Sequence, residues 1–216
     1  MLRVARSGAL KARTGALNQL RSLVSTAPVG LREQLRDLPI ATLVTTTAML
    51  RPASAADTTA VTKRALRSLG RRVQQLEVEI DKLDELLRPL VVKTAPALLA
   101  CHGVGPETAS PLLIAAGDNA GRLRSEAAYA RICGVAPIPA GSGKTDGNHR
   151  LHRGGDRQAN AALWRIVMVR MSSDPRTQAY VERRTKEGLS KKKIIRCLKR
   201  YMARELYRYL PQETTA

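Results

Sequence analysis

The sharpest hydrophobic pattern in the chain runs from Leu66 to Leu90. Apolar residues recur there at alternating intervals of three and four positions, namely Leu66, Leu69, Val73, Leu76, Ile80, Leu83, Leu87 and Leu90. These intervals are those of the a and d positions of a coiled coil. At 1.5 Å of rise per residue, the predicted helix would be roughly 37 Å long.

Charge divides this predicted helix into two halves. The basic residues come first and the acidic residues follow: Arg67, Arg71 and Arg72, then Glu77, Glu79, Asp81, Asp84 and Glu85. Such polarity favours antiparallel pairing, because opposite charges then face each other along the seam. We favour self-association through the seam, and packing of the seam on another helix of the same chain is the alternative.

Helical spacing recurs on both sides of the seam. The stretches concerned are 3–25, 31–38, 125–132, one that begins after Asp156 and one that begins after Ser190. Ser125, Asp156 and Ser190 are residue types that cap helix N-termini. Residues 40–56 are weakly patterned and fit either a helix or a loop. The sequence therefore predicts a mainly α fold, with a long coiled-coil helix followed by a compact helical domain.

Residues 98–115 have the pattern of a helix-hairpin-helix. A helix is expected to end near Cys101, and Pro106 is well placed to start the next one. Between them, Gly103 and Gly105 offer amides that could hold a phosphate at a helix N-terminus. Such a module would bind the nucleic-acid backbone without reading bases. The alternative is a plain helical hairpin that packs the core, since residues 101–143 carry no net charge.

Composition strengthens the helical prediction and points to a polyanionic partner. The chain of 216 residues has no Phe, so its core must be built from small and aliphatic side chains. Its formal net charge is +19. Residues 144–216 hold 18 basic and 7 acidic residues, whereas residues 101–143 hold 3 of each. A nucleic acid is favoured over an anionic membrane surface.

Cysteine, histidine and hydropathy patterns exclude several classes. The three cysteines are Cys101, Cys133 and Cys197, with no C-x-x-C pair, and they are typical of reduced thiols in a cytoplasmic protein. The histidines lack the spacing of a zinc site. No apolar run is long enough to span a membrane. We expect no cofactor in this chain and no membrane partner.

A glycine-rich loop carries the candidate nucleophile, Ser142, which lies between Gly141 and Gly143. Glycine on both sides lets the backbone approach a ligand closely. Four cations follow before the next predicted helix: Lys144, Arg150, Arg153 and Arg157. An ordinary surface turn is the alternative. The run G-S-G-K-T is a poor match to a nucleotide-binding loop, because the first glycine of that motif would fall on Ile138.

The last predicted helix has one apolar side and one basic side. Its basic residues are Lys191, Lys192, Lys193, Arg196, Lys199, Arg200, Arg204 and Arg208. Only Glu205 is there to balance them. A charged run is usually a solvated face, but so many cations repel one another unless a polyanion is present. We take Lys191, Lys192, Lys193, Arg196 and Arg200 as candidate nucleic-acid-binding residues.

With these residues in hand, the chain resembles the C-terminal part of transposases of the insertion-sequence one-hundred-and-ten family, which also contains pilin-gene-inverting recombinases. The matching segments are KARTGALNQLRSLV, GVGPETA, AYARICGVAPIPAGSGKT, HRLHRGGDRQANAALWRIVMVRM, DPRTQAYVERRTKEG and SKKKIIRCLKRYMARELY. The resemblance covers nearly the whole chain, and the last hundred residues match most specifically.

The resemblance implies an architecture and a chemistry. Family members have a RuvC-like domain with four acidic metal ligands, a coiled coil, and a C-terminal domain with a serine essential for strand exchange. That serine corresponds to Ser142, and Gly141 stands where many relatives have a second serine. The resemblance further implies DNA recombination guided by an RNA. Ser142 would attack a DNA phosphodiester, with Asp146, His149 and His152 as nearby candidate bases.

On this basis we expect three parts. Residues 1–56 would be a helical segment trailing a RuvC-like domain, residues 57–93 a coiled coil, and residues 94–216 the transposase C-terminal domain. A divalent metal is expected only with the acidic domain, and if the family mechanism needs that domain to activate the serine, this chain alone should be a poor catalyst. DNA, a guide RNA and a second copy of the chain are the expected partners, in the cytoplasm and at the nucleoid. The alternative is a catalytically inactive coiled-coil module that binds nucleic acid.

Overall fold

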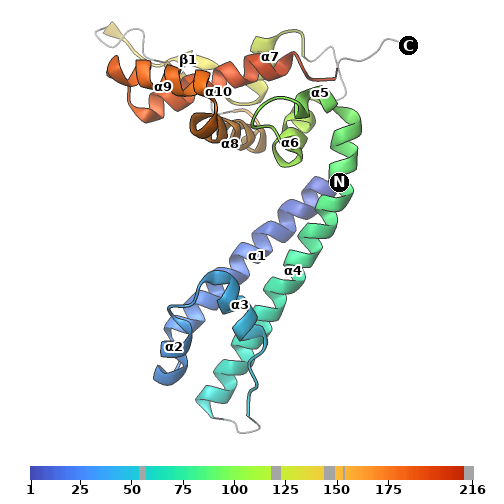
Figure 1. The fold of residues 1–216 in the computed structure, drawn as a ribbon, viewed down its shortest axis with the longest axis vertical. Helices are drawn as coiled ribbons and strands as arrows, with labels where there is room; N and C mark the ends of the chain where they lie inside the picture. Colours follow the sequence, from blue (N-terminus) through green and yellow to red (C-terminus); the bar gives the residue numbers. More distant parts are fainter. Residues whose placement is uncertain (54–56, 118–122, 144–148, 153, 212–216) are drawn as a thin grey trace. The chain divides into compact units, whose positions relative to one another are not determined.

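A computed structural model describes residues 1–53, 57–117, 123–143, 149–152 and 154–211 (Figure 1). Ten helices and one two-stranded sheet make up this described part of the chain. The prediction of a mainly α fold, with a long helix followed by a compact set of helices, is confirmed. The chain divides into two compact units, Met1–Leu87 and Arg88–Ala216.

The regular elements in the described part of the first unit are all helices. Its helices are α1 (Leu2–Ser25), α2 (Val29–Leu35), α3 (Ile40–Ala48) and most of α4 (Thr58–Thr94). Pro28 and Pro39 are the N-cap residues of α2 and α3. Leu20, Leu35, Leu66 and Val73 are buried together in an aliphatic core that these helices share.

The apolar seam of α4 packs on other helices of the same chain. Figure 1 shows α1 lying alongside the lower part of α4. Two ion pairs fix an antiparallel arrangement: Arg6 pairs with Asp84, and the Nη2 atom of Arg13 lies 2.6 Å from an oxygen of Glu77. The seam residues Leu66, Val73 and Ile80 are buried. The structure thus has the seam packed on other helices of the same chain, and self-association stays a prediction.

A glycine lets α3 approach α4 closely. A Cβ atom at Gly70 would lie 2.7 Å from the backbone nitrogen of Ala48 and 2.7 Å from the hydroxyl oxygen of Thr47. Both distances are shorter than van der Waals contact, so a larger residue at 70 would push the helices apart. The weakly patterned stretch 40–56 therefore contains a helix that packs on the seam helix.

The second unit surrounds α8 with helices and one hairpin. Its elements after the end of α4 are α5 (Pro96–Leu99), α6 (Pro106–Ala116), α7 (Glu126–Ile132), β1 (Pro137–Pro139), β2 (His149–Leu151), α8 (Arg157–Ser173), α9 (Pro175–Lys186) and α10 (Lys191–Tyr207). The core includes Tyr129, Leu163, Ile166 and Leu206, all fully buried. No helix in the described ranges is long and apolar enough to cross a membrane.

Ser125, Asp156 and Ser190 are the N-cap residues of α7, α8 and α10, as predicted, although the side chain of Ser190 makes no capping hydrogen bond. Ser125 Oγ accepts a hydrogen bond from Ala128 N, and Asp156 Oδ1 accepts from the backbone nitrogens of Gln158 and Ala159. Asp174 caps α9 in the same way, through Thr177 N. Helix α9 itself was not predicted, since its sequence is mostly polar and lacks a clear apolar stripe.

Candidate nucleic-acid interface

Ser142 lies in the loop of a β-hairpin. The strands β1 and β2 pair antiparallel, with Pro137 opposite Leu151 and Pro139 opposite His149. Proline is tolerated here because the sheet has only two strands, so each strand has a free edge. Ser142 is exposed, and Gly143 has a positive φ of 56°. The candidate nucleophile is therefore at the surface and in a turn that glycine favours.

Backbone hydrogen bonds extend the pairing of the hairpin and join the start of α8 to the end of α7. His152 N donates to Ala136 O, at 2.9 Å, and Asp156 N donates to Ile132 O, at 2.7 Å. Beside them, a Cβ atom at Gly155 would lie 2.2 Å from the nitrogen of Gly134. Only glycine allows this approach, which fixes where the hairpin ends and α8 begins.

A polar bridge joins α8 to α10 next to the hairpin. Asn160 Nδ2 donates to the carbonyl oxygens of Cys133 and Gly134, at 3.1 and 2.8 Å. Its Oδ1 accepts from Lys199 Nζ at 2.8 Å. Burial, and then the nearby charge of Arg196, lowers the pKa of Lys199. Lys199 thus positions α10, although the sequence placed it on the basic face with the nucleic-acid-binding candidates.

The base of the hairpin forms one wall of a basic cavity of about 520 Å³. Helices α9 and α10 form the other walls. The lining residues are Pro137, His149, Arg150, Leu151, Arg184, Leu189, Lys193, Arg196, Cys197, Arg200 and Tyr201. None of these described residues is acidic. We call this hollow the hairpin cavity.

The hairpin cavity brings together cations that are far apart in sequence. Arg150 comes from β2, and Lys193 and Arg196 come from α10. All three are exposed. Lys191 and Lys192 are exposed in the first turn of α10, and Arg157 is exposed at the start of α8. Lys144, Asp146 and Arg153 lie outside the described residues.

Arg200 is engaged differently from the other candidates. Its Nη1 and Nη2 atoms donate to the two carboxylate oxygens of Glu126, at 2.6 and 2.8 Å. The hydrogen bond from Arg200 lowers the pKa of Glu126, and the same pairing raises the pKa of Arg200. A guanidinium held in this bidentate way has less capacity for a phosphate. Arg200 joins α10 to α7, and its role in nucleic-acid binding stays a prediction.

The predicted helix-hairpin-helix is present only as two helices joined by a turn. Gly103 has a positive φ of 77°, and a Cβ atom there would lie 3.4 Å from Val169 of α8. Gly105 N donates to Thr108 Oγ1 at 3.0 Å, inside the start of α6. Arg170 Nε donates to His102 O at 2.8 Å. These contacts give the turn a packing role, and phosphate binding by Gly103 and Gly105 stays a prediction.

Two aromatic residues of this unit are partly exposed. Trp164 is 47% exposed on α8. Tyr201 lines the hairpin cavity and was not singled out. Its ring meets that of Tyr180 edge-on, with 5.7 Å between centroids. Helical spacing could have found Tyr201, because it lies four residues after Cys197 and therefore on the same face of α10.

Metal ligands do not gather in this part of the molecule. Among the described residues, no three histidine, cysteine or acidic side chains lie close enough together to hold a metal ion. The cysteines Cys101 and Cys197 are half-buried and Cys133 is buried, and all three are free thiols.

These features define a helical domain with a basic cavity at the base of a hairpin and an exposed serine in the loop of that hairpin. Residues 95–182 match the model of the Transposase IS116/IS110/IS902 family. This segment is therefore similar to a transposase domain of that family.

Two relatives support the assignment. The chain is 27% identical over 157 residues to the insertion element IS900 uncharacterized 42 kDa protein of Mycobacterium paratuberculosis, covering 68% of this chain and 39% of that protein. It is 31% identical over 124 residues to the insertion element IS110 uncharacterized 43.6 kDa protein of Streptomyces coelicolor, covering 57% of this chain and 29% of that protein. The matched part thus spans well under half of either relative.

Proposed function

We propose that this chain takes part in DNA transposition, with Ser142 as the nucleophile that cleaves and rejoins DNA strands. The observation that supports this most directly is the position of Ser142. It is exposed on a hairpin whose base lines a cavity with three exposed cations and no acidic lining residue among those described. A phosphodiester bound there would meet a hydroxyl and a positive field together.

The proposed step is a transesterification. Ser142 Oγ forms a bond to phosphorus, the bond from phosphorus to a deoxyribose oxygen breaks, and that oxygen takes a proton as it leaves. The proton of Ser142 passes to a base, for which His149 and His152 are the described candidates. Because the phosphodiester is conserved in the phosphoserine link, a hydroxyl of another strand can reverse the step and join the new end. Arg150, Lys193 and Arg196 would stabilise the charge on the phosphate oxygens.

An RNA guide and a metal-binding RuvC-like partner domain belong to the same proposal. Both are implied by the resemblance described above, and the match of residues 95–182 to the transposase family supports that resemblance. In this scheme, the described residues contribute phosphate binding and the hydroxyl. The chemistry that activates the hydroxyl would come from the other domain.

Mass spectrometry of a covalent adduct tests the nucleophile. The full chain is incubated with duplex DNA carrying an element end, with and without a RuvC-like domain supplied as a second chain. We expect an adduct whose peptide maps to Ser142. Ser142→Ala should abolish the adduct and leave DNA affinity within about twofold, because one hydroxyl contributes little to a salt-sensitive interface.

Ser172→Ala is the matched control, because Ser172 is exposed on α8 and outside the hairpin. It should leave the adduct unchanged. Absence of an adduct in every arrangement, with DNA still bound, would overturn the catalytic proposal. The chain would then be a nucleic-acid-binding module without chemistry of its own.

A further inference from the structure

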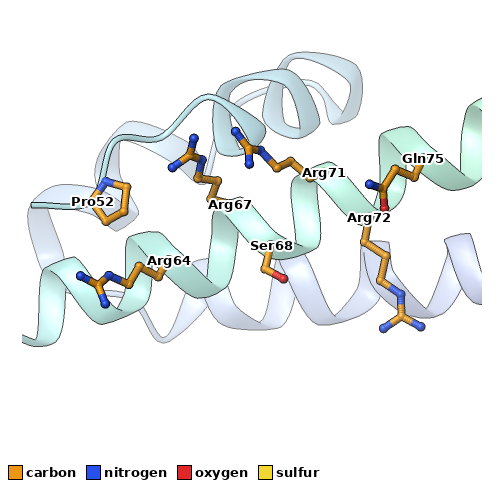
Figure 2. A pocket seen from close by; sticks show the side chains of 7 residues that line it. All are labelled: Pro52, Arg64, Arg67, Ser68, Arg71, Arg72 and Gln75. Atoms are coloured by element: carbon orange, nitrogen blue, oxygen red, sulfur yellow. The ribbon is translucent and has the colours of Figure 1, made fainter.

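A second basic surface lies in the first unit, on the first half of α4. It consists of Arg64, Arg67, Arg71 and Arg72, which we call the α4 arginine strip. These residues line a hollow of about 600 Å³. The other residues that line it are Pro52, Ser68 and Gln75. Figure 2 shows Arg67 and Arg71 extending from one side of α4 and Arg72 from the other. The lining contains four positive charges and, among described residues, no negative one.

The two halves of α4 differ in whether their charged side chains form ion pairs. In the second half, Asp84 and Glu77 pair with arginines of α1. In the first half, the four arginines of the strip have no ion pair among the described residues. The Nε atom of Arg67 is moreover buried without a hydrogen-bond partner. Buried polar atoms are almost always satisfied, so this donor indicates a missing acceptor.

The spacing of the strip fits a regular array of anions. Arg64, Arg67 and Arg71 follow the i, i+3, i+7 pattern that places residues on one helix face. They span roughly 10 Å of helix axis at 1.5 Å per residue. A nucleic-acid strand advances about 3.4 Å of axis per phosphate, so the strip covers about three phosphates.

The surroundings of the strip favour a duplex over a single strand. Residues 1–87 contain no Phe, Tyr or Trp. Proteins that hold single strands stack the bases on aromatic side chains, and this unit has none to offer. A duplex hides its bases and presents phosphates, which arginine binds with two parallel hydrogen bonds.

We propose that the α4 arginine strip binds the phosphate backbone of a double-stranded nucleic acid, independently of its sequence. This goes beyond the function proposed for Ser142, because the strip lies in the other unit and needs no chemistry at that serine. Contacts to phosphates fix position and carry no sequence information.

Fluorescence anisotropy of the full chain with a 20-base-pair duplex, measured between 50 and 300 mM salt, tests the proposal. One arm uses DNA and the other uses RNA of the same sequence. R64Q/R71Q should weaken binding about tenfold at 100 mM salt and reduce the salt slope by about 2, because two phosphate contacts are lost. Loss in the DNA arm, the RNA arm or both supports the proposal and identifies the source of the duplex.

K11Q/K82Q is the matched control, because it removes two charges from exposed positions of the same unit outside the strip. It should change affinity less than threefold. R64K/R71K keeps the charge and should restore most of the binding, which separates lost contacts from misfolding. Equal effects of R64Q/R71Q and K11Q/K82Q on both duplexes would overturn the proposal. That outcome leaves the Ser142 adduct unaffected, so failure of one proposal is distinguishable from failure of the other.

Discussion

Arg200 and Glu126 form a bidentate ion pair that joins α10 to the first turn of α7. The two hydrogen bonds measure 2.6 and 2.8 Å, and both side chains are largely shielded from solvent, at 22% and 29% exposure. Glu126 also lies at the N-terminus of α7, where the helix dipole favours a negative charge. The pair therefore connects α7 to the helix that supplies Lys193 and Arg196 to the hairpin cavity.

Replacing Glu126 by Gln should destabilise the second unit by about 1 kcal/mol, since partly exposed ion pairs contribute little more. The pKa of Glu126 is lowered in the folded state by its hydrogen bond from Arg200. A lowered pKa contributes stability that is present above the unfolded value of about 4.3. This contribution is lost as the pH falls through the folded value. Urea denaturation at pH 7 and pH 3.5 measures both effects.

The comparison with Glu126→Gln isolates this pair. Because Asp174 also has a lowered pKa, through its hydrogen bond with Thr177, the variant should keep part of the acid sensitivity. The gap between wild type and Glu126→Gln should close as the pH falls. A gap that stays constant from pH 7 to pH 3.5 would contradict the assignment of the shift to Arg200.

Local signals explain what the sequence predicts well. Ser125 and Asp156 start helices because their side chains accept hydrogen bonds from amides two or three residues away, so no distant part of the chain is needed. The apolar repeat after Leu66 predicts a helix for the same reason. The sequence does not determine which helix packs on this repeat, because α1 of the same chain and a helix of a second copy could both bury the same apolar positions.

Distant contacts explain what the sequence misses. The two strands of the hairpin have three residues each, and the pairing of Pro137 with Leu151 has no periodic signal. Arg200 is 74 residues from Glu126, so its pairing could not be read from α10 alone. Trp164 lies on α8, which has apolar residues on several faces, so its exposure could not be predicted from the sequence. The loop that contains Ser142 could be predicted from local composition alone. The hairpin cavity could not, because residues far apart in the sequence line it.

Gly155→Ala should displace the Ser142 hairpin. The added Cβ atom would lie 2.2 Å from Gly134 N and 2.6 Å from Ile132 O, so the backbone must move. Overpacking of this kind costs about 1–3 kcal/mol. We expect a lower melting temperature together with loss of the Ser142 adduct.

Gly8→Ala is the control for this substitution, because a Cβ atom at Gly8 of α1 has no neighbour within 4 Å. Alanine there should stabilise the helix by about 0.5–1 kcal/mol. Thermal unfolding followed by circular dichroism measures both variants. If Gly155→Ala unfolds at the wild-type temperature, the close approach of the hairpin to α7 is wrong.

Alkylation of Cys197 should report occupation of the hairpin cavity. Cys197 lines that cavity beside Lys193 and Arg196, whereas Cys133 is fully buried. Burial raises the pKa of the Cys133 thiol to about 12, so at pH 8 it has almost no reactive thiolate. Burial also raises the pKa of Cys101, which is half-buried. We therefore expect iodoacetamide to modify Cys197 first, as measured by peptide mass spectrometry.

Duplex DNA bound at the cavity should slow this modification several-fold, because phosphates held by Lys193 and Arg196 would cover the sulfur. The K193Q/R196Q variant supplies the control, since it keeps the thiol and removes the cations that would hold the DNA. In that variant, the rate of Cys197 alkylation should be the same with and without DNA, and the DNA affinity should fall about tenfold at 100 mM salt. Equal protection of Cys197 in both proteins would show that Lys193 and Arg196 do not hold the DNA, and absence of protection in the wild type would place the DNA elsewhere. Either result would contradict the role of the hairpin cavity in phosphate binding.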